Sequence, residues 1–292
     1  MELESLSVSS EIEGIEFVEY ATRCPQEFGA ALLAMGFRPV ARHRSREVLL
    51  YRQGDVNVIV NADAGALDGE SQKSDSAVLL KALAIRVPDA GLAYRHALEC
   101  GGEAVASRAG PMELNIPGIH GPGGAVLFLL DRRADVSFYE VDFLPLPGAH
   151  FNAPALAGLH FFGVVQYLPS GDTARWRTFY EKVLGFAPLP EDVRFGVLPR
   201  GMVMKSACAR FFLQFIEPPA AAEDAHWQEG FNRVALGVPD VARAVAEGQS
   251  NREVAEQLHI TERTVKAHLK AVFEKLQVAD RLQLALRVHG VR

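Results

Sequence analysis

The sequence has few cysteines, no long hydrophobic run and no basic segment near its start. Its three cysteines, Cys24, Cys100 and Cys208, are odd in number and far apart, which excludes a disulfide framework and a paired-cysteine metal site. Apolar runs such as 125–130 and 160–165 are far shorter than the roughly 20 residues of a membrane-spanning helix. The first residues, MELESLSVSSEIEG, are acidic and lack the features of a secretory signal. These absences predict a cytoplasmic protein.

Charge is distributed unevenly along the chain. The 292 residues, 49% of them hydrophobic, are enough for about two domains, and the net charge is −6. Residues 248–292 hold eight Lys and Arg against five Asp and Glu, a net charge of +3, which leaves −9 in residues 1–247. A sign change between segments indicates that they meet different partners. The alternative is a chance excess of basic residues on a solvated helical face.

The sequence repeats itself at offsets of 144 to 151 residues. The matching pairs are 14–17 with 158–161, 35–37 with 184–186, and 84–89 with 235–240. Such spacing indicates an internal duplication, which sets the architecture. In the first copy, predicted strands 48–51 and 56–60 flank Gln53, Gly54 and Asp55, a composition typical of a hairpin turn.

Each copy is predicted to contain two modules of one strand, one helix and three strands (βαβββ). The fourth module is incomplete, because from Gly248 onward the pattern is helical and about three expected strands are absent. We therefore predict an α+β protein of paired βαβββ modules, with a truncated second pair, followed by an all-α domain. The predicted parts are a disordered N-terminus (1–13), a first domain (14–144), a linker rich in Pro, Gly and Ala (145–157), a truncated second domain (158–246) and a helical domain (247–292).

Two strings carry a family resemblance. HRSREVLLYRQGDVNVIVN (43–61) and GPMELNIPGIHGPGG (110–124) resemble the N-terminal half of bacterial 4-hydroxyphenylpyruvate dioxygenases. These enzymes belong to the glyoxalase-like vicinal-oxygen-chelate superfamily, whose fold is built from paired βαβββ modules. The resemblance covers about 14–246 and implies a non-haem iron dioxygenase acting on a small aromatic 2-oxo acid.

The resemblance also implies an Fe(II) site of two histidines and one carboxylate, which leaves open positions for a 2-oxo acid and dioxygen. His160 matches the first ligand position. The second falls at Arg233, and an arginine offers no lone pair to a metal. The third falls where the chain has become helical, so the expected iron site is incomplete. The alternative for His160 is a hydrogen-bonded histidine in the core.

The last 45 residues have the pattern of two helices joined by a tight turn. Ser250 and Glu253 have the spacing of a capping box, in which each side chain accepts from the backbone amide of the other. The next helix is capped by Thr261, and its two faces differ. Apolar residues at helical spacing are Val265, Leu269, Val272, Phe273 and Leu276, and basic residues on the opposite face are Arg263, Lys266 and Lys270. This pattern predicts a helix-turn-helix, with an ordinary solvated helix pair as the alternative.

Residues 250–286, SNREVAEQLHITERTVKAHLKAVFEKLQVADRLQLAL, resemble the LuxR-type DNA-binding domain, over about 240–292 in all. The match places Lys266, Ala267 and Lys270 at positions that face the DNA groove. It places Thr264, His268 and Arg281 near phosphates or in support of the helix. Lysines on such a face displace counterions from DNA and donate to guanine edges.

Three functions remain open from the sequence. The first is a transcription regulator that binds double-stranded DNA as a homodimer, with a body that binds a small aromatic acid or drives dimerisation. The second is an Fe(II) dioxygenase with an impaired metal site, and the third is a non-catalytic scaffold. Residues 238–247 fit both the first helix of the fourth module and the first helix of a LuxR-type domain. A natural fusion, a frameshift product and an artificial chimera all fit this junction.

Overall fold

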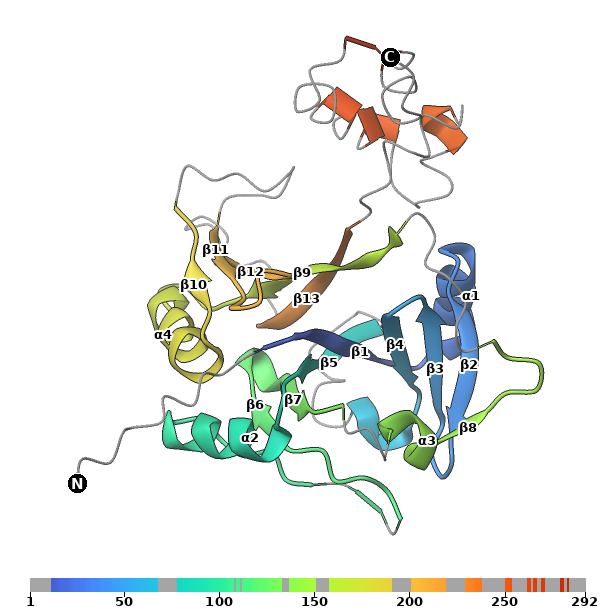
Figure 1. The fold of residues 1–292 in the computed structure, drawn as a ribbon, viewed down its shortest axis with the longest axis horizontal. Coiled ribbons are helices and arrows are strands. Elements are labelled where there is room, and N and C mark those ends of the chain that lie inside the picture. The colour runs from blue at the N-terminus through green and yellow to red at the C-terminus, as the bar shows by residue number, and fades with distance from the viewer. Residues whose placement is uncertain are drawn as a thin grey trace.

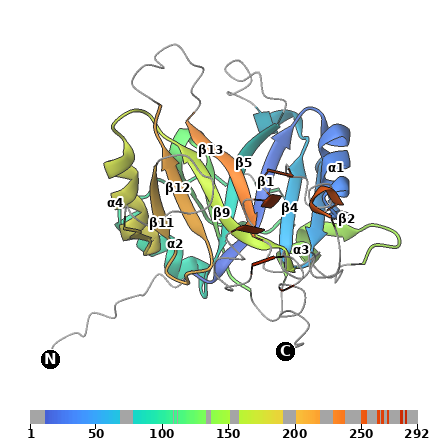
Figure 2. The same ribbon diagram turned by 90° about the horizontal axis from the view of Figure 1, so that it is seen from above.

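The computed structural model contains two β-sheets with helices packed beside them (Figures 1 and 2). It describes residues 12–67, 78–107, 109–110, 112–132, 137–150, 158–190, 201–218 and 229–237, and in the C-terminal part 250–253, 262–263, 265–266, 269–270, 279–280 and 283. The mixture of strands and helices confirms the predicted α+β class. Within these residues, no helix has both the length and the apolar character that crossing a membrane requires.

The first sheet has eight strands in the order β6-β7-β5-β1-β4-β3-β2-β8. Its strands are β1 (Gly14–Thr22), β2 (Arg38–His43), β3 (Val48–Gln53), β4 (Val56–Asn61), β5 (Val78–Arg86), β6 (Gly118–His120), β7 (Val126–Leu130) and β8 (Phe143–Pro145). Its helices are α1 (Pro25–Ala34), α2 (Ala90–Glu99), α3 (Phe138–Asp142) and the 3-10 turns η1 (Ala64–Leu67) and η2 (Pro122–Gly124).

Local sequence explains several of these boundaries. The predicted hairpin joins β3 to β4 through Gly54, whose φ of +55° suits glycine. Asp89 caps α2, because its carboxylate accepts a 2.7 Å hydrogen bond from the Leu92 amide. Gly185 ends the helix α4 (Thr173–Leu184) in the left-handed conformation with φ +64°.

The second sheet has five strands in the order β10-β11-β12-β9-β13. Its elements are β9 (His160–Tyr167), α4 (Thr173–Leu184), β10 (Ala187–Pro188), β11 (Met202–Lys205), β12 (Phe212–Ile216) and β13 (Gly230–Gly237). β9 pairs parallel with β12 and antiparallel with β13, just as β1 pairs parallel with β4 and antiparallel with β5. The strand pairing therefore confirms the duplication that the sequence predicts.

The two copies differ at one edge. In the first sheet β5 has a further parallel neighbour, β7, and β6 lies beyond it. In the second sheet β13, the counterpart of β5, is the last strand among the residues that the structure describes. Among the described residues, the second sheet therefore ends at β13.

The first sheet extends slightly beyond the predicted boundaries. Ile12 is 3% exposed, and the amide of Glu13 donates to the Arg86 carbonyl at 2.8 Å. These two residues fall in the segment predicted to be disordered. At the other end β8 pairs with β2, and the Leu146 amide donates to the Val40 carbonyl. The start of the predicted linker is thus part of the first sheet.

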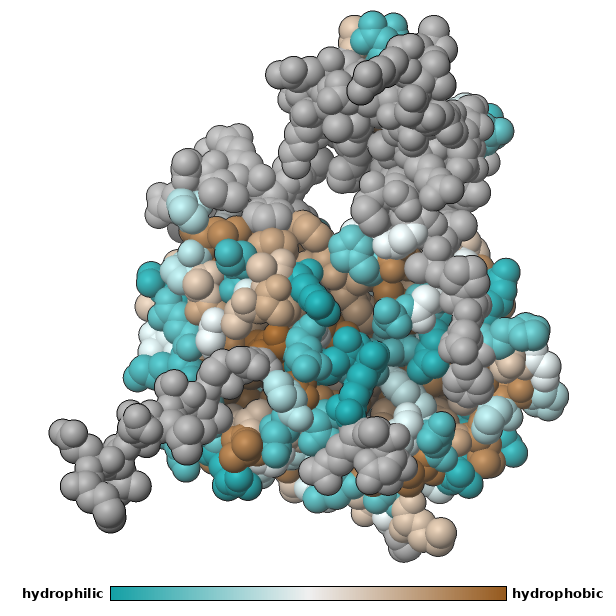
Figure 3. Space-filling model, viewed as in Figure 1, coloured by the Kyte–Doolittle hydropathy of each residue, from teal (hydrophilic) through white to brown (hydrophobic). Residues whose placement is uncertain are grey.

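The two sheets pack against each other through β13. Phe231 on β13 is 7% exposed and belongs to the same hydrophobic core as Leu80 and Leu83 of β5. At Gly123 of η2, an added Cβ atom would lie 2.0 Å from the Glu229 carbonyl oxygen, so only glycine allows this approach. Hydrophilic side chains gather in the middle of the outer face where Figure 1 draws β13 and β1 (Figure 3).

Candidate functional sites

His160 lies at the start of β9 and is exposed. Its Nδ1 atom is 3.2 Å from the carbonyl oxygen of Gly158, and Gly237 lies opposite it on β13. A Cβ atom at Gly237 would lie 2.6 Å from the imidazole ring, so the absence of a side chain there makes room for His160. The alternative of a core histidine is therefore wrong, because the ring is not buried.

Arg233, at the position of the second iron ligand, lies opposite Val165 rather than His160. Its Nη2 donates to the hydroxyl of Tyr167 at 3.0 Å, and its guanidinium lies 6.0 Å from the centre of that ring. Val165 is five residues from His160, or about 16 Å along an extended strand. The two side chains therefore do not converge on one point.

These positions do not fit an iron ion. Arg233 is a cation without a free lone pair, and among the residues that the structure describes no group of three or more His, Cys, Asp or Glu side chains is arranged to hold a metal. Glu217, near the end of β12, instead accepts hydrogen bonds from the Gly171 and Thr173 amides and the Thr173 hydroxyl. These hydrogen bonds lower its pKa, although burial raises it in part.

The predicted capping box is present at the start of the helical domain. The Ser250 amide donates to the Glu253 carboxylate at 2.6 Å, and the Glu253 amide donates to the Ser250 hydroxyl at 3.2 Å. Asp280 and Gln283 form a second pair that the sequence analysis missed. The Gln283 amide donates to Asp280 Oδ1, and Gln283 Oε1 accepts from the Ala279 amide, both at 2.8 Å. This is the spacing of a helix start.

The predicted recognition helix has one buried and one exposed side. Val265 and Leu269, four residues apart, are 0% and 5% exposed. Lys266 and Lys270 are helical and exposed, also four residues apart. Residues at this spacing share one face of a helix, so two lysines lie together on a solvent-facing side. The other predicted DNA-binding residues, Thr264, Ala267, His268 and Arg281, lie outside the described residues.

The first sheet borders a cavity of about 410 Å³, which is lined by residues from all eight of its strands. One wall is hydrophobic and consists mainly of Phe17, Val48, Ile59, Phe128, Phe138 and Phe143. The Phe17 and Phe138 rings are stacked with centroids 5.6 Å apart, and Phe138 meets Phe143 edge-on at 5.5 Å. The small side chain of Ala82 lies opposite Glu19 on the neighbouring strand and leaves space there.

Another part of the lining is polar, and two of its side chains are largely buried. The side chains of His43 and Glu113 are 9% and 10% exposed, with 3.9 Å between His43 Nε2 and Glu113 Oε1. Burial raises the pKa of Glu113, but hydrogen bonds from the Gly110 amide, Ser45 and Arg46 outweigh it and lower the pKa to about 2. Arg46 forms an ion pair with the Glu113 carboxylate. Glu113 thus fastens the loop before β6 to the β2–β3 turn.

Two further carboxyl groups line the cavity. Asp142, at the end of α3, is 4% exposed, and its Oδ1 accepts a 2.9 Å hydrogen bond from the Leu114 amide. Glu19, on β1, accepts a 2.7 Å hydrogen bond from Asn61. Burial raises the pKa of both groups above the ordinary value. Sequence reasoning missed this cluster because its members come from separate strands and loops with no characteristic spacing.

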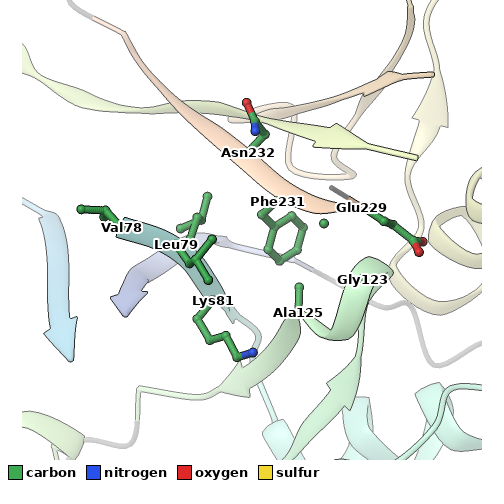
Figure 4. Close-up of a pocket in the computed structure, with 10 residues that line it drawn as sticks. Val78, Leu79, Lys81, Gly123, Ala125, Glu229, Phe231 and Asn232 are labelled. Carbon is green, nitrogen blue, oxygen red and sulfur yellow. The ribbon is translucent and has the colours of Figure 1, made fainter. Parts of the chain in front are cut away.

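A second cavity, of about 130 Å³, lies where the two sheets meet. It is lined by β5, η2 and the start of β13. The Phe231 ring extends from β13 toward Leu79 and Ala125, whereas the Asn232 side chain points away from the cavity (Figure 4). This cavity is small, and its main feature is the aromatic contact that holds β13 against the first sheet.

Two segments match known protein families. Residues 9–144 match the family described as hydroxyphenylpyruvate dioxygenase, HPPD, N-terminal. Residues 239–288 match the bacterial regulatory proteins of the luxR family. The two matches cover the first sheet and the predicted helix-turn-helix, and they confirm both resemblances.

Two relatives agree with the first match, and one solved structure shares the fold. The 4-hydroxyphenylpyruvate dioxygenase of Pseudomonas sp. strain P.J. 874 is 38% identical over 175 residues, which cover 59% of this chain and 48% of that protein. The 4-hydroxyphenylpyruvate dioxygenase of Pseudomonas aeruginosa PAO1 is 30% identical over 258 residues, covering 82% of this chain and 70% of that one. A solved xylose isomerase-like TIM barrel/4-hydroxyphenylpyruvate dioxygenase fusion protein has a TM-score of 0.70 at 24% identity, covering 97% of this chain and 44% of its own.

The chain spans about half the length of the first curated relatives that it matches. The family model covers residues 9–144, which contain almost the whole first sheet. The chain therefore belongs to the 4-hydroxyphenylpyruvate dioxygenase family, and it carries at its C-terminus a DNA-binding domain of the luxR family.

Proposed function

We propose that this protein regulates transcription by binding double-stranded DNA through residues 247–292, while residues 14–144 and 158–246 form a body without iron catalysis. The observation that carries the proposal is the pair of exposed lysines, Lys266 and Lys270, on a helix whose Val265 and Leu269 are buried. A cationic helix face that fits the major groove is how helix-turn-helix domains contact DNA. Thr264, Ala267, His268 and Arg281 complete the proposed contact surface.

The DNA test uses the full chain and a pool of random double-stranded DNA, from which bound sequences are selected. We expect the double variant Lys266→Ala, Lys270→Ala to bind the selected DNA at least about tenfold more weakly. Each lost phosphate contact also reduces the slope of log affinity against log salt by about 0.9. Lys182→Ala with Lys205→Ala removes the same charge from the second sheet and serves as the control. Unchanged binding by the Lys266 and Lys270 variant would refute the assignment.

We also propose that the protein acts as a homodimer. Helix-turn-helix domains bind half-sites in pairs, so a regulator of this type needs a second copy. β13 supports this proposal, because it ends the described second sheet where its counterpart β5 has a further neighbour. An open strand edge is a ready surface for pairing with another chain. Sedimentation of the full chain over a range of concentrations tests this, and a monomer throughout contradicts it.

The alternative is an Fe(II)-dependent dioxygenase that acts on a small aromatic 2-oxo acid such as 4-hydroxyphenylpyruvate. The family membership favours it, whereas the register of His160 and Arg233 counts against it. The two functions are separated by metal analysis and by oxygen uptake with 4-hydroxyphenylpyruvate. Stoichiometric iron together with oxygen uptake would favour the dioxygenase over the regulator without iron catalysis. Binding of the 2-oxo acid without turnover would instead support a regulatory ligand.

A further inference from the structure

We propose that the cavity inside the first sheet binds a small organic ammonium ion with an aromatic or apolar body, and that Asp142 receives the cationic head. This site lies in residues 14–144, away from the position of the family's iron ligands in the second sheet. It requires neither iron chemistry nor DNA binding. The argument rests on the charge of the cavity wall, the burial of Asp142 and the position of the aromatic rings.

The cavity wall carries more acidic than basic groups. Among the described residues that line it, four carboxyl groups belong to Glu19, Asp63, Glu113 and Asp142, two permanently charged cations to Arg46 and Lys81, and two imidazoles to His43 and His120. Arg46 forms an ion pair with Glu113, and both Arg46 and Lys81 act electrostatically on Glu19. Carboxylates therefore remain in excess, and a buried carboxylate without sufficient compensating charge is costly. A bound cation would offset that cost, whereas a bound anion would add to it.

Asp142 is the carboxyl group best placed for the cation. It is 4% exposed and lines the cavity, and one of its oxygens accepts from the Leu114 amide. The groups that act on it electrostatically are His43, Glu113 and Arg46. Glu113 is an anion already paired with Arg46, and burial lowers the pKa of His43. Burial therefore disfavours the imidazolium form of His43, which is the form that stabilises the Asp142 carboxylate.

Aromatic rings line the same cavity as this carboxyl group. Phe143 follows Asp142 in the chain, packs edge-on against Phe138 and lies 5.3 Å from the His43 ring. Phe17 stacks on Phe138 at 5.6 Å. A carboxylate next to aromatic faces recognises an ammonium group by charge and by cation–π attraction, and the same rings pack against its apolar body. The described residues offer no metal-binding cluster here, so a metal ion is not the expected occupant.

The experiment titrates the full chain by calorimetry, without DNA, with three probes that share one body. They are 2-phenylethylamine (a cation), 2-phenylethanol (neutral) and 3-phenylpropanoate (an anion). We expect the cation to bind at least about tenfold more tightly than the alcohol, because a charge-assisted hydrogen bond replaces a neutral one. The anion should bind weakest. Equal binding of the cation and the alcohol, or tightest binding of the anion, overturns the proposal.

Two variants locate the site. Asp142→Asn removes the charge but keeps an acceptor for the Leu114 amide, and it should weaken binding of the cation about 10- to 100-fold while leaving the alcohol unchanged. Asp55→Asn, in the exposed β3–β4 turn, is the matched control. Ala82→Leu places extra carbons in the cavity and should abolish binding of both probes, which tests the site even if Asp142→Asn fails to fold. Unchanged binding of the cation by folded Asp142→Asn, or by folded Ala82→Leu, refutes the assignment.

Discussion

Gly237, rather than Arg233, lies opposite His160 in the ladder between β9 and β13. Gly237 leaves the space that the His160 ring occupies, while Arg233 lies further along the strand and donates to the Tyr167 hydroxyl. His160, the predicted first iron ligand, therefore has no ligand partner at the predicted second position. The pairing of the two strands, as well as the identity of residue 233, argues against an iron site.

Restoring a histidine at position 233 should therefore not restore iron binding. In Arg233→His the new imidazole would lie opposite Val165, about 16 Å along the strand from His160. We expect less than stoichiometric iron after anaerobic incubation with Fe(II) and removal of excess metal, as for the wild type. Metal analysis by mass spectrometry measures this. If Arg233→His bound one iron per chain and the wild type did not, the result would contradict the β9–β13 pairing that places residue 233 far from His160.

The approach of η2 to β13 should make Gly123 intolerant of a side chain. Gly123 has φ +60°, and an added Cβ atom would lie 2.0 Å from the Glu229 carbonyl oxygen. Gly148 has φ +72° with no atom within 4 Å of such a Cβ. Both Gly→Ala changes cost about 1 kcal/mol for the left-handed backbone, and Gly123→Ala should cost about 2 kcal/mol more through the clash. Urea unfolding measures the difference, and equal losses would show that the two sheets are not in contact there.

Phe231 should contribute strongly to the free energy of unfolding, because its 7% exposed ring joins β13 to the first sheet. Truncation of a buried phenylalanine to alanine costs about 3 to 5 kcal/mol. We expect Phe231→Ala to fall in this range. Asn232→Ala, next to it but exposed, should change the free energy by less than about 0.5 kcal/mol. Denaturant titration of both variants measures the free energy of unfolding. A similar loss of free energy in both would contradict the packing of Phe231 against the first sheet.

Glu113 should make the protein sensitive to acid. Its pKa is lowered from the ordinary value of 4.5 to about 2, because the hydrogen bonds to its carboxylate outweigh burial. A lowered pKa contributes stability that is fully present above about pH 4.5 and is lost as the pH falls toward 2. Glu113→Gln should therefore flatten the pH dependence of unfolding in this window. Exposed Glu27→Gln serves as the control, and an unaltered profile in Glu113→Gln would disprove the role.

The capping box at Ser250 should stabilise the helix that precedes the recognition helix. The Ser250 hydroxyl accepts from the Glu253 amide at 3.2 Å, which satisfies a donor at the helix start. Ser250→Ala should therefore cost the helical domain about 1 kcal/mol. Thermal unfolding followed by circular dichroism measures the loss. Ser250→Asp, which keeps a side-chain acceptor, should retain most of the stability, and equal losses in both variants would contradict the capping role.

Sequence patterns alone predicted the duplication, the α+β class and the capping box. Repeats, hairpin turns and caps depend on residues that are close in the chain or recur at a fixed offset, so they are visible without a fold. The same reasoning predicted the amphipathic helix of Val265 and Lys266, because a helix places residues of known spacing on one face. The prediction that Arg233 stands at the second iron-ligand position came instead from the family resemblance and stays a prediction.

Other features were decided only by the tertiary structure. The strand register that separates His160 from Arg233 is set by the long-range pairing of β9 with β13. The cavity lined by Glu19, Glu113 and Asp142 assembles side chains from β1, the loop before β6 and α3. No local spacing relates these residues, because long-range strand pairing and the curvature of the sheet bring them together. The sequence determined the modules and the basic helix, and the packing of the sheets decided which side chains meet.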